Sequence, residues 1–108
     1  IPGSVKKLDK YGIDKIPNIG WRKVSFENNE LEQFTGEYFY FVHSYSAFPT
    51  IKENILGTTK LEDHQVTAIV SSDNNKIGRY VGCQFHPEKS GNVGLRFLEN
   101  ILNKLHNI

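Results

Sequence analysis

One segment of ten residues, 82–91, constrains the fold of this chain more than any other. It reads Gly-Cys-Gln-Phe-His-Pro-Glu-Lys-Ser-Gly, follows an apolar run and precedes the clearest helical pattern in the chain. This arrangement predicts a strand that ends near Phe85 and a helix that begins near Ser90. Between them lie an imidazole and a carboxylate two residues apart, those of His86 and Glu88.

The spacing of His86 and Glu88 favours two side chains that act together. In an extended backbone, residues two apart point to the same side, about 6.5–7 Å from each other at about 3.3 Å per residue. Pro87 disfavours the helical conformation of His86 and so keeps it extended. The carboxylate can then hold one ring nitrogen and leave the other free as a base. Spacing alone leaves open that the two residues form an incidental pair on a surface turn.

The residues after Ser90 predict the only strong helix of the chain. Its apolar side chains recur on one face of a helix: Val93, Phe97, Leu98, Ile101, Leu102 and Leu105. The opposite, polar face carries Arg96, Glu99, Asn103 and Lys104. Ser90 is predicted to be the N-cap of this helix, because serine oxygens accept hydrogen bonds from first-turn N–H groups.

The rest of the chain predicts mainly strands. Alternating, β-branched or aromatic side chains predict strands at residues 23–27, 37–43, 55–60, 65–71 and 77–85. A hairpin turn is predicted at 73–76, a short strand at 5–8, a turn at 17–21, a helical turn at 30–34 and a loop at 46–49. Read alone, this is a β-rich chain closed by one helix, with one modest core.

Composition excludes several classes of protein. The chain has 108 residues, of which 38% are hydrophobic and 23% charged, as in a globular domain. It has no apolar stretch long enough to span a membrane. A net charge of +1, with basic and acidic residues mixed, argues against a nucleic-acid surface.

Metal and cofactor sites are not expected either. His43, His64, His86 and His106 include no pair at the usual spacing of metal ligands, and the chain has only one cysteine. A single cysteine also fits a reducing cytoplasm. The chain contains no methionine, so residue 1 is not expected to be a translation start.

Three motifs together resemble a known family. Residues 84–90, Gln-Phe-His-Pro-Glu-Lys-Ser, are similar to the signature that supplies the second and third catalytic residues of class I (triad) glutamine amidotransferases. Residues 17–21, Pro-Asn-Ile-Gly-Trp, and 40–45, Tyr-Phe-Val-His-Ser-Tyr, resemble the glutaminase subunits of imidazole glycerol phosphate synthases, in the same order. The similarity covers nearly the whole chain. It implies an α/β, flavodoxin-like fold, of which residues 1–108 form the C-terminal part of a single glutaminase domain.

The resemblance also implies a reaction. His86 takes the proton from a cysteine thiol and returns it to departing ammonia, while Glu88 fixes the ring tautomer and stabilises the imidazolium. Glutamine is hydrolysed through a glutamyl thioester, and ammonia passes to a barrel-shaped cyclase (synthase) subunit in histidine biosynthesis. The family's nucleophilic cysteine lies on an elbow that has no counterpart here. We therefore expect that the N-terminal half is absent and that this chain alone is inactive.

Other residues take roles from the same resemblance. Ser44, Tyr45 and His43 correspond to positions that contact the glutamine substrate, and Trp21, Tyr40 and Lys89 to positions that face the synthase subunit. Read without the family, these residues have plainer explanations: a structural strand histidine, strand-end loop residues, a core or lid tryptophan and a solvated lysine.

Two positions limit the comparison with the family. The family usually has Asn after Gly-Trp, whereas this chain has Arg22, which leaves open a paralogue that serves surface-sugar biosynthesis. A second alternative to a glutaminase is a domain of the same fold that is not an enzyme and binds a partner. Cys83 is not expected to complete the triad, because strand alternation puts it on the face of Phe85, opposite His86. It is predicted to be a small buried apolar residue.

Overall fold

The computed structural model describes residues 1–106, which form seven strands, four 3-10 helices and one α-helix. The strands are β1 (Gly3–Lys7), β2 (Asn18–Phe26), β3 (Tyr38–His43), β4 (Tyr45–Pro49), β5 (Ile55–Leu61), β6 (His64–Asp73) and β7 (Lys76–Cys83). The helices are η1 (Leu8–Tyr11), η2 (Glu32–Phe34), η3 (Lys52–Asn54), η4 (Pro87–Lys89) and α1 (Gly91–His106). The prediction of a β-rich chain closed by one C-terminal helix is confirmed.

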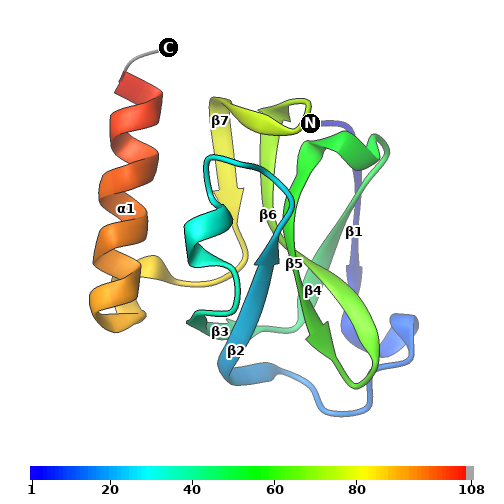
Figure 1. Cartoon of the computed structure of the whole chain (residues 1–108). Coiled ribbons are helices and arrows are strands. Elements are labelled where there is room, and N and C mark those ends of the chain that lie inside the picture. The colour runs from blue at the N-terminus through cyan, green and yellow to red at the C-terminus, as the bar shows by residue number, and fades with distance from the viewer. Residues whose placement is uncertain (107–108) are drawn as a thin grey trace.

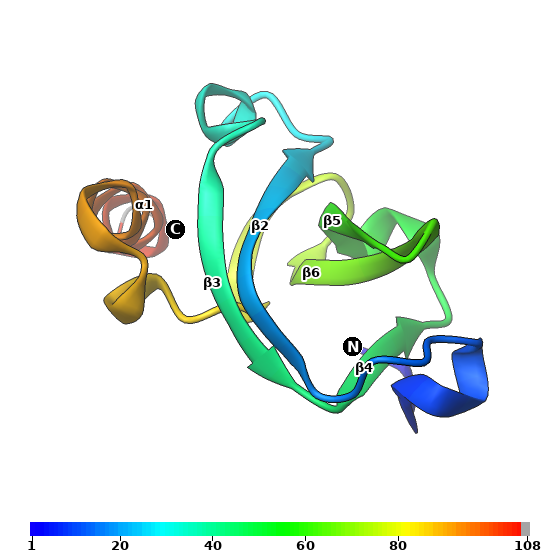
Figure 2. The ribbon, with the colours of Figure 1, turned by 90° about the horizontal axis from the view of Figure 1, so that it is seen from below.

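Five strands form one antiparallel sheet in the order β3-β2-β5-β6-β7, and β1 pairs with β4 in a separate two-stranded sheet. The larger sheet is strongly curled, with α1 on one side and the β1–β4 pair on the other (Figures 1 and 2). β7 is joined to α1 by a short connection that contains η4. No helix within residues 1–106 is long and apolar enough to cross a membrane.

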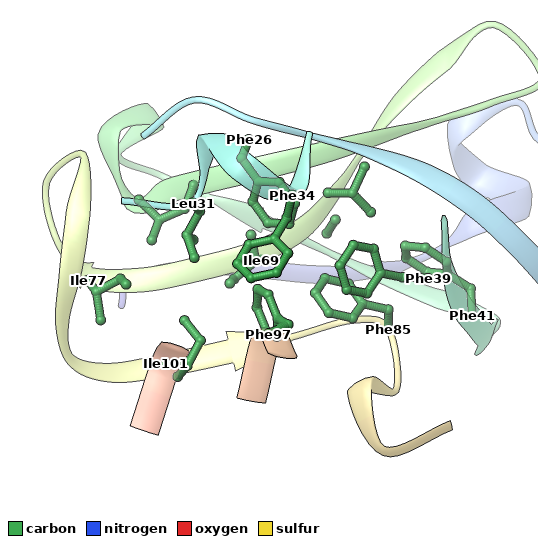
Figure 3. Packing of buried hydrophobic residues seen from close by; sticks show 13 residues of the cluster. Phe26, Leu31, Phe34, Phe39, Phe41, Ile69, Ile77, Phe85, Phe97 and Ile101 are labelled. Atoms are coloured by element: carbon green, nitrogen blue, oxygen red, sulfur yellow. The ribbon is translucent and has the colours of Figure 1, made fainter. Parts of the chain in front are cut away.

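The core lies where α1 packs on the sheet, and aromatic rings dominate it (Figure 3). Phe97 of α1 lies within 5.2–6.0 Å, between ring centroids, of Phe26, Phe34, Phe39 and Phe85. Most of these pairs are edge-to-face, the arrangement that ring quadrupoles favour. Phe85, which directly precedes His86, is 2% exposed, and its ring packs within this cluster.

The predicted face of α1 is largely confirmed. Phe97 and Ile101 are buried, and Val93, Leu98 and Leu105 are partly buried. Leu102 was predicted in the same face but is 60% exposed. A helix turns about 100° per residue, so the predicted set was wider than the contact surface of a single sheet, and Leu102 falls outside it.

Two segments are strands where other structure was expected. Residues 17–21 were predicted to be a turn, yet β2 begins at Asn18 and pairs with β3 from that residue on. Gly20, with φ of 138°, allows this backbone, which other residues rarely adopt. Residues 46–49 were predicted to be a loop, but they pair with β1 some 40 residues away as part of β4. Local sequence carries no signal for such a distant pairing.

Candidate active site

His86 and Glu88 form a pair at the point where the sheet passes into α1. The Nδ1 atom of His86 lies 3.0 Å from Oε2 of Glu88. Because a carboxylate only accepts hydrogen bonds, this geometry selects the tautomer with the proton on Nδ1. The side chains are 37% and 58% exposed, respectively, so Nε2 is available as a base at the surface.

Electrostatics favour the charged form of Glu88. The hydrogen bond from His86 is the main cause that lowers the pKa of the Glu88 carboxyl, with a smaller contribution from the backbone N–H of Glu88 itself. The carboxylate therefore remains ionised at the pH values at which an imidazole works as a base.

The backbone of His86 is fixed on the edge of β3. Its N–H donates to the carbonyl of Tyr40 at 2.9 Å, and its own carbonyl accepts from the N–H of Lys89 at 3.0 Å. His86 is extended, with φ of −104° and ψ of 95°, and Pro87 opens η4 directly after it. The extended conformation of His86 that Pro87 predicts is confirmed.

Ser90 differs from its predicted role. It precedes α1 as expected, but its hydroxyl donates to the carbonyl of His86 at 2.6 Å and accepts from the N–H of Tyr40 at 2.9 Å. The hydroxyl is thus used to join the His86 segment to β3. Sequence reasoning missed this contact because it connects residues 50 positions apart.

The proposed substrate residues lie at the corner between β3 and β4. Ser44 is the bend between the two strands, and its carbonyl accepts from the N–H of Leu8 at 2.8 Å. Tyr45 opens β4 and is 55% exposed. Both are accessible, and neither forms a side-chain hydrogen bond to the His86–Glu88 pair, so their contact with substrate stays a prediction.

His43 is buried at the same corner and is fully bonded. Its Nε2 accepts from the amide of Asn18 at 2.9 Å, and its Nδ1 donates to the carbonyl of Tyr45 at 2.8 Å. Arg22 donates through Nε to Asn18 Oδ1 at 3.0 Å, which fixes the orientation of that amide. Sequence reasoning identified His43 and Arg22 but gave no role to Asn18.

The buried position of His43 favours its neutral form. Burial is the main cause that lowers its pKa below 6.5, and nearby His86 lowers it further. The hydrogen bond to Tyr45 opposes these effects without outweighing them. His43 therefore lies close enough to His86 for the two rings to influence each other electrostatically, and its lowered pKa favours the neutral ring.

Trp21, which is exposed, and Tyr40, which is half-buried, form an aromatic pair on the outer face of β2 and β3. They are opposite each other in the strand register, with ring centroids 5.7 Å apart in an edge-to-face arrangement. Trp21 is 50% exposed, which excludes the core role considered for it. Ile19 and Val42, the adjacent pair on the same face, are exposed as well. Lys89 is exposed in η4, beside the His86–Glu88 pair.

Cys83 was predicted to be buried beside Phe85, and this was wrong. The residue is exposed at the end of β7, whereas Phe85 is buried. Strand alternation stops at Cys83, so it could not be extended across the bend that follows. Local desolvation of the thiol in an apolar groove beside Ala47 and Val70, then the charge of Glu88, raise its pKa to about 12.

No cluster in the described part of the chain suggests a metal centre. Within residues 1–106, no three side chains of His, Cys, Asp or Glu lie close enough together to hold an ion.

Comparison with known proteins gives this pair a context. The model of the family "Glutamine amidotransferase class-I" matches residues 10–105. The chain belongs to the class I glutamine amidotransferase family. Domains of this family have a flavodoxin-like α/β fold, so the predicted fold class and the resemblance are both confirmed.

Three relatives that carry the same name are similar to most of the chain. The chain is 45% identical over 103 residues to imidazole glycerol phosphate synthase subunit HisH of Sulfolobus acidocaldarius, covering 94% of this chain and 48% of that protein. It is 43% identical over 89 residues to the same subunit of Methanopyrus kandleri, covering 82% and 42%. For the subunit of Natronomonas pharaonis the identity is 38% over 107 residues, with 95% and 46% covered. The chain thus spans about half the length of the curated relatives it matches.

Proposed function

We propose that this chain supplies the general base and its carboxylate partner to a glutaminase that delivers ammonia to a synthase. The observation that carries the proposal is the 3.0 Å contact between His86 Nδ1 and Glu88 Oε2, in a chain of the class I amidotransferase family. This contact leaves Nε2 of His86 free to accept a proton. The names of the relatives support imidazole glycerol phosphate synthase as the assembly.

The reaction follows from these groups. Nε2 of His86 removes the proton of a cysteine thiol, and the thiolate attacks the side-chain amide carbon of glutamine. The protonated ring then gives its proton to the nitrogen as the C–N bond breaks, which releases ammonia and leaves a glutamyl thioester. Water, deprotonated by the same nitrogen, hydrolyses the thioester to glutamate and the free thiol. Glu88 holds the ring in one tautomer and stabilises its charged form through both stages.

We further propose that the nucleophile belongs to an N-terminal half of the same domain, outside the 108 residues described by this sequence. The thiol of Cys83, with a pKa of about 12, is poorly suited to the role, because the thiolate is the reactive form. No hydrogen bond joins Cys83 to His86 in residues 1–106.

Two surfaces complete the proposal. Ser44 and Tyr45, at the corner of β3 and β4, bind the α-carboxylate and amino end of glutamine. His43 supports them from within, because both its ring nitrogens are bonded inside the corner. Trp21, Tyr40 and Lys89 face the synthase subunit. Tyr40 and Lys89 each bond the His86 backbone, and Trp21 packs its exposed ring against Tyr40. Arg22 bonds to Asn18. The departure from the family at this position therefore does not remove the aromatic face.

The test uses the complete glutaminase subunit with its synthase partner. Replacing His86 by Ala removes the base and should lower glutamine hydrolysis about 10²–10⁴-fold. Glu88→Gln keeps the size of the side chain and an acceptor oxygen, so its loss should be smaller. Normal ammonia release by a folded His86→Ala subunit would show that His86 is not the base. No ammonia release by the unchanged subunit with its partner would favour the non-enzymatic alternative, in which the fold only binds a partner.

A further inference from the structure

Ser90 is almost completely buried, at 1% exposed, and its hydroxyl has two backbone partners. It donates to the carbonyl of His86 at 2.6 Å and accepts from the N–H of Tyr40 at 2.9 Å. The N–H of His86 donates to the carbonyl of Tyr40 at 2.9 Å. Three hydrogen bonds therefore form a closed ring among Tyr40, His86 and Ser90.

The ring attaches the His86 segment to the free edge of β3. β3 is the first strand of the curled sheet, so the polar groups of Tyr40 on the side away from β2 need partners from elsewhere. His86 and Ser90 provide them, one with a backbone N–H and the other with a hydroxyl. The backbone of the base is thereby fixed to the same residue whose ring packs on Trp21.

Close packing on the other side of Ser90 limits its movement. Gly94, in the first turn of α1, is in such close contact with η4 that an added Cβ would collide with the carbonyl oxygen of Pro87. The same Cβ would lie 2.9 Å from Cβ of Ser90. The N–H of Ser90 also donates to the carbonyl of Pro87 at 3.1 Å. The hydroxyl is therefore held in place by α1 and η4 while it holds His86.

We propose that Ser90 is a positioning residue of the glutaminase reaction, whose buried hydroxyl fixes the His86 backbone against β3 and so keeps the imidazole on Glu88. The inference rests on the proposed function for its kinetic consequence. The hydroxyl does not touch substrate and moves no proton. It acts only through the place it gives to His86.

The kinetic test is Ser90→Ala in the complete subunit with its synthase partner. We expect kcat for glutamine hydrolysis to fall about tenfold to a hundredfold with little change in KM, because a misplacement of about 1 Å can cost about 10²-fold. Ser71→Ala is the matched control. Ser71 is equally buried, and its hydroxyl accepts from the N–H of Gly78 at 2.7 Å, in the β6–β7 hairpin. This control should lose stability and keep kcat.

A second readout does not depend on activity. Long-range proton–nitrogen NMR spectra of the imidazole should show mainly the Nδ1–H tautomer of His86 in the unchanged protein and a mixture in Ser90→Ala. If Ser90→Ala does not fold, Ser90→Cys, which has nearly the same shape and a weak donor, takes its place in both measurements.

The outcomes separate this inference from the proposed function. Unchanged kcat and an unchanged tautomer in folded Ser90→Ala would overturn the positioning role, and so would a rise in KM alone. The proposed function fails if the unchanged subunit with its partner does not hydrolyse glutamine, or if folded His86→Ala hydrolyses it normally. The tautomer measurement then still decides whether Ser90 positions the ring.

Discussion

At the scale of single residues, the two histidines near the corner of β3 and β4 are arranged for opposite duties. His86 bonds an ionised carboxylate through Nδ1 and leaves Nε2 free. His43 has both ring nitrogens bonded, to the Asn18 amide and the Tyr45 carbonyl, and its pKa is lowered mainly by burial. His86 thus has one ring nitrogen free to accept a proton, whereas both ring nitrogens of His43 are bonded.

The state of His43 predicts a dependence of stability on pH. Its pKa is below 6.5 in the folded protein and near 6.5 in the unfolded chain. The unfolded chain thus takes up this proton first as the pH falls. The contribution of His43 is complete above pH 6.5 and decreases from there towards the folded pKa. Its slope is at most about 1.4 kcal/mol per pH unit.

Denaturant titrations of the protein at several pH values between about 5 and 8, on either side of the ordinary histidine pKa, measure this effect. His43→Gln should be less stable throughout and should lose that part of the slope. His106→Gln, on the exposed last turn of α1, should keep it. If His43→Gln and the unchanged protein have parallel pH profiles, His43 is not the group that titrates.

At the scale of elements, the outer face of β2 and β3 carries paired side chains that a sheet facing only water does not require. Ile19 is opposite Val42, Trp21 opposite Tyr40 and Lys23 opposite Tyr38. All three pairs lie on one face, because residues two apart along a strand share it. The inner face of the same strands carries buried Phe39 and Phe41. This apolar outer face suits a protein partner better than solvent.

The face predicts an effect on assembly. Trp21→Ala should weaken binding of the synthase subunit about tenfold or more, since a buried tryptophan in an interface commonly contributes about 2 kcal/mol. Lys89→Ala should have a smaller effect, about 1 kcal/mol, because an exposed charge at the rim is partly screened. Titrating glutaminase activity with the synthase subunit measures both. Leu102→Ala, on the exposed face of α1, is the control. If the titration curve of Trp21→Ala matches that of the control, the interface lies elsewhere.

Local signals in the sequence were sufficient for elements that their own residues determine. The hairpin at Asp73–Lys76 was predicted from its asparagines, and Asn75 indeed has φ of 57°. The periodicity of α1 correctly identified Phe97 and Ile101. His86 and Glu88 do form a pair, as predicted, but Glu88 lies in the 3-10 helix η4 and not in the extended backbone from which the pairing was inferred. β4 and the first half of β2 were missed because distant strands determine them.

The same distinction holds for the site. Asn18 and Ser90 each bond one partner four residues away and another 25 or 50 residues away, and the distant partner could not be inferred from a local pattern. The exposure of Cys83 was missed because alternation fails where a strand ends. The sequence thus identified His86, Glu88 and His43, while the fold determined which groups hold them.

At the scale of the whole molecule, the chain contains the His86–Glu88 pair, which we propose as the base and its carboxylate partner, but only one thiol. The His86–Glu88 pair is built entirely from elements within these residues, anchored on β3 and α1. Cys83 is the sole cysteine of the sequence, and its thiol has a pKa of about 12. At pH 8, four units lower, only about one thiol in ten thousand would be ionised. Base and nucleophile are therefore not matched within this chain.

This mismatch predicts that the 108-residue chain alone does not hydrolyse glutamine. Without a reactive thiolate no glutamyl thioester forms, and loss of the nucleophile of a triad leaves only a small residual rate. The measurement is ammonia release from glutamine by the purified chain, repeated after adding the N-terminal half of the glutaminase domain as a separate chain. Activity should appear only in the mixture, and His86→Ala should abolish it there. Cys83→Ala should leave the mixture active, because the thiol takes no part. Hydrolysis by the lone chain that Cys83→Ala removes would show that Cys83 is the nucleophile after all.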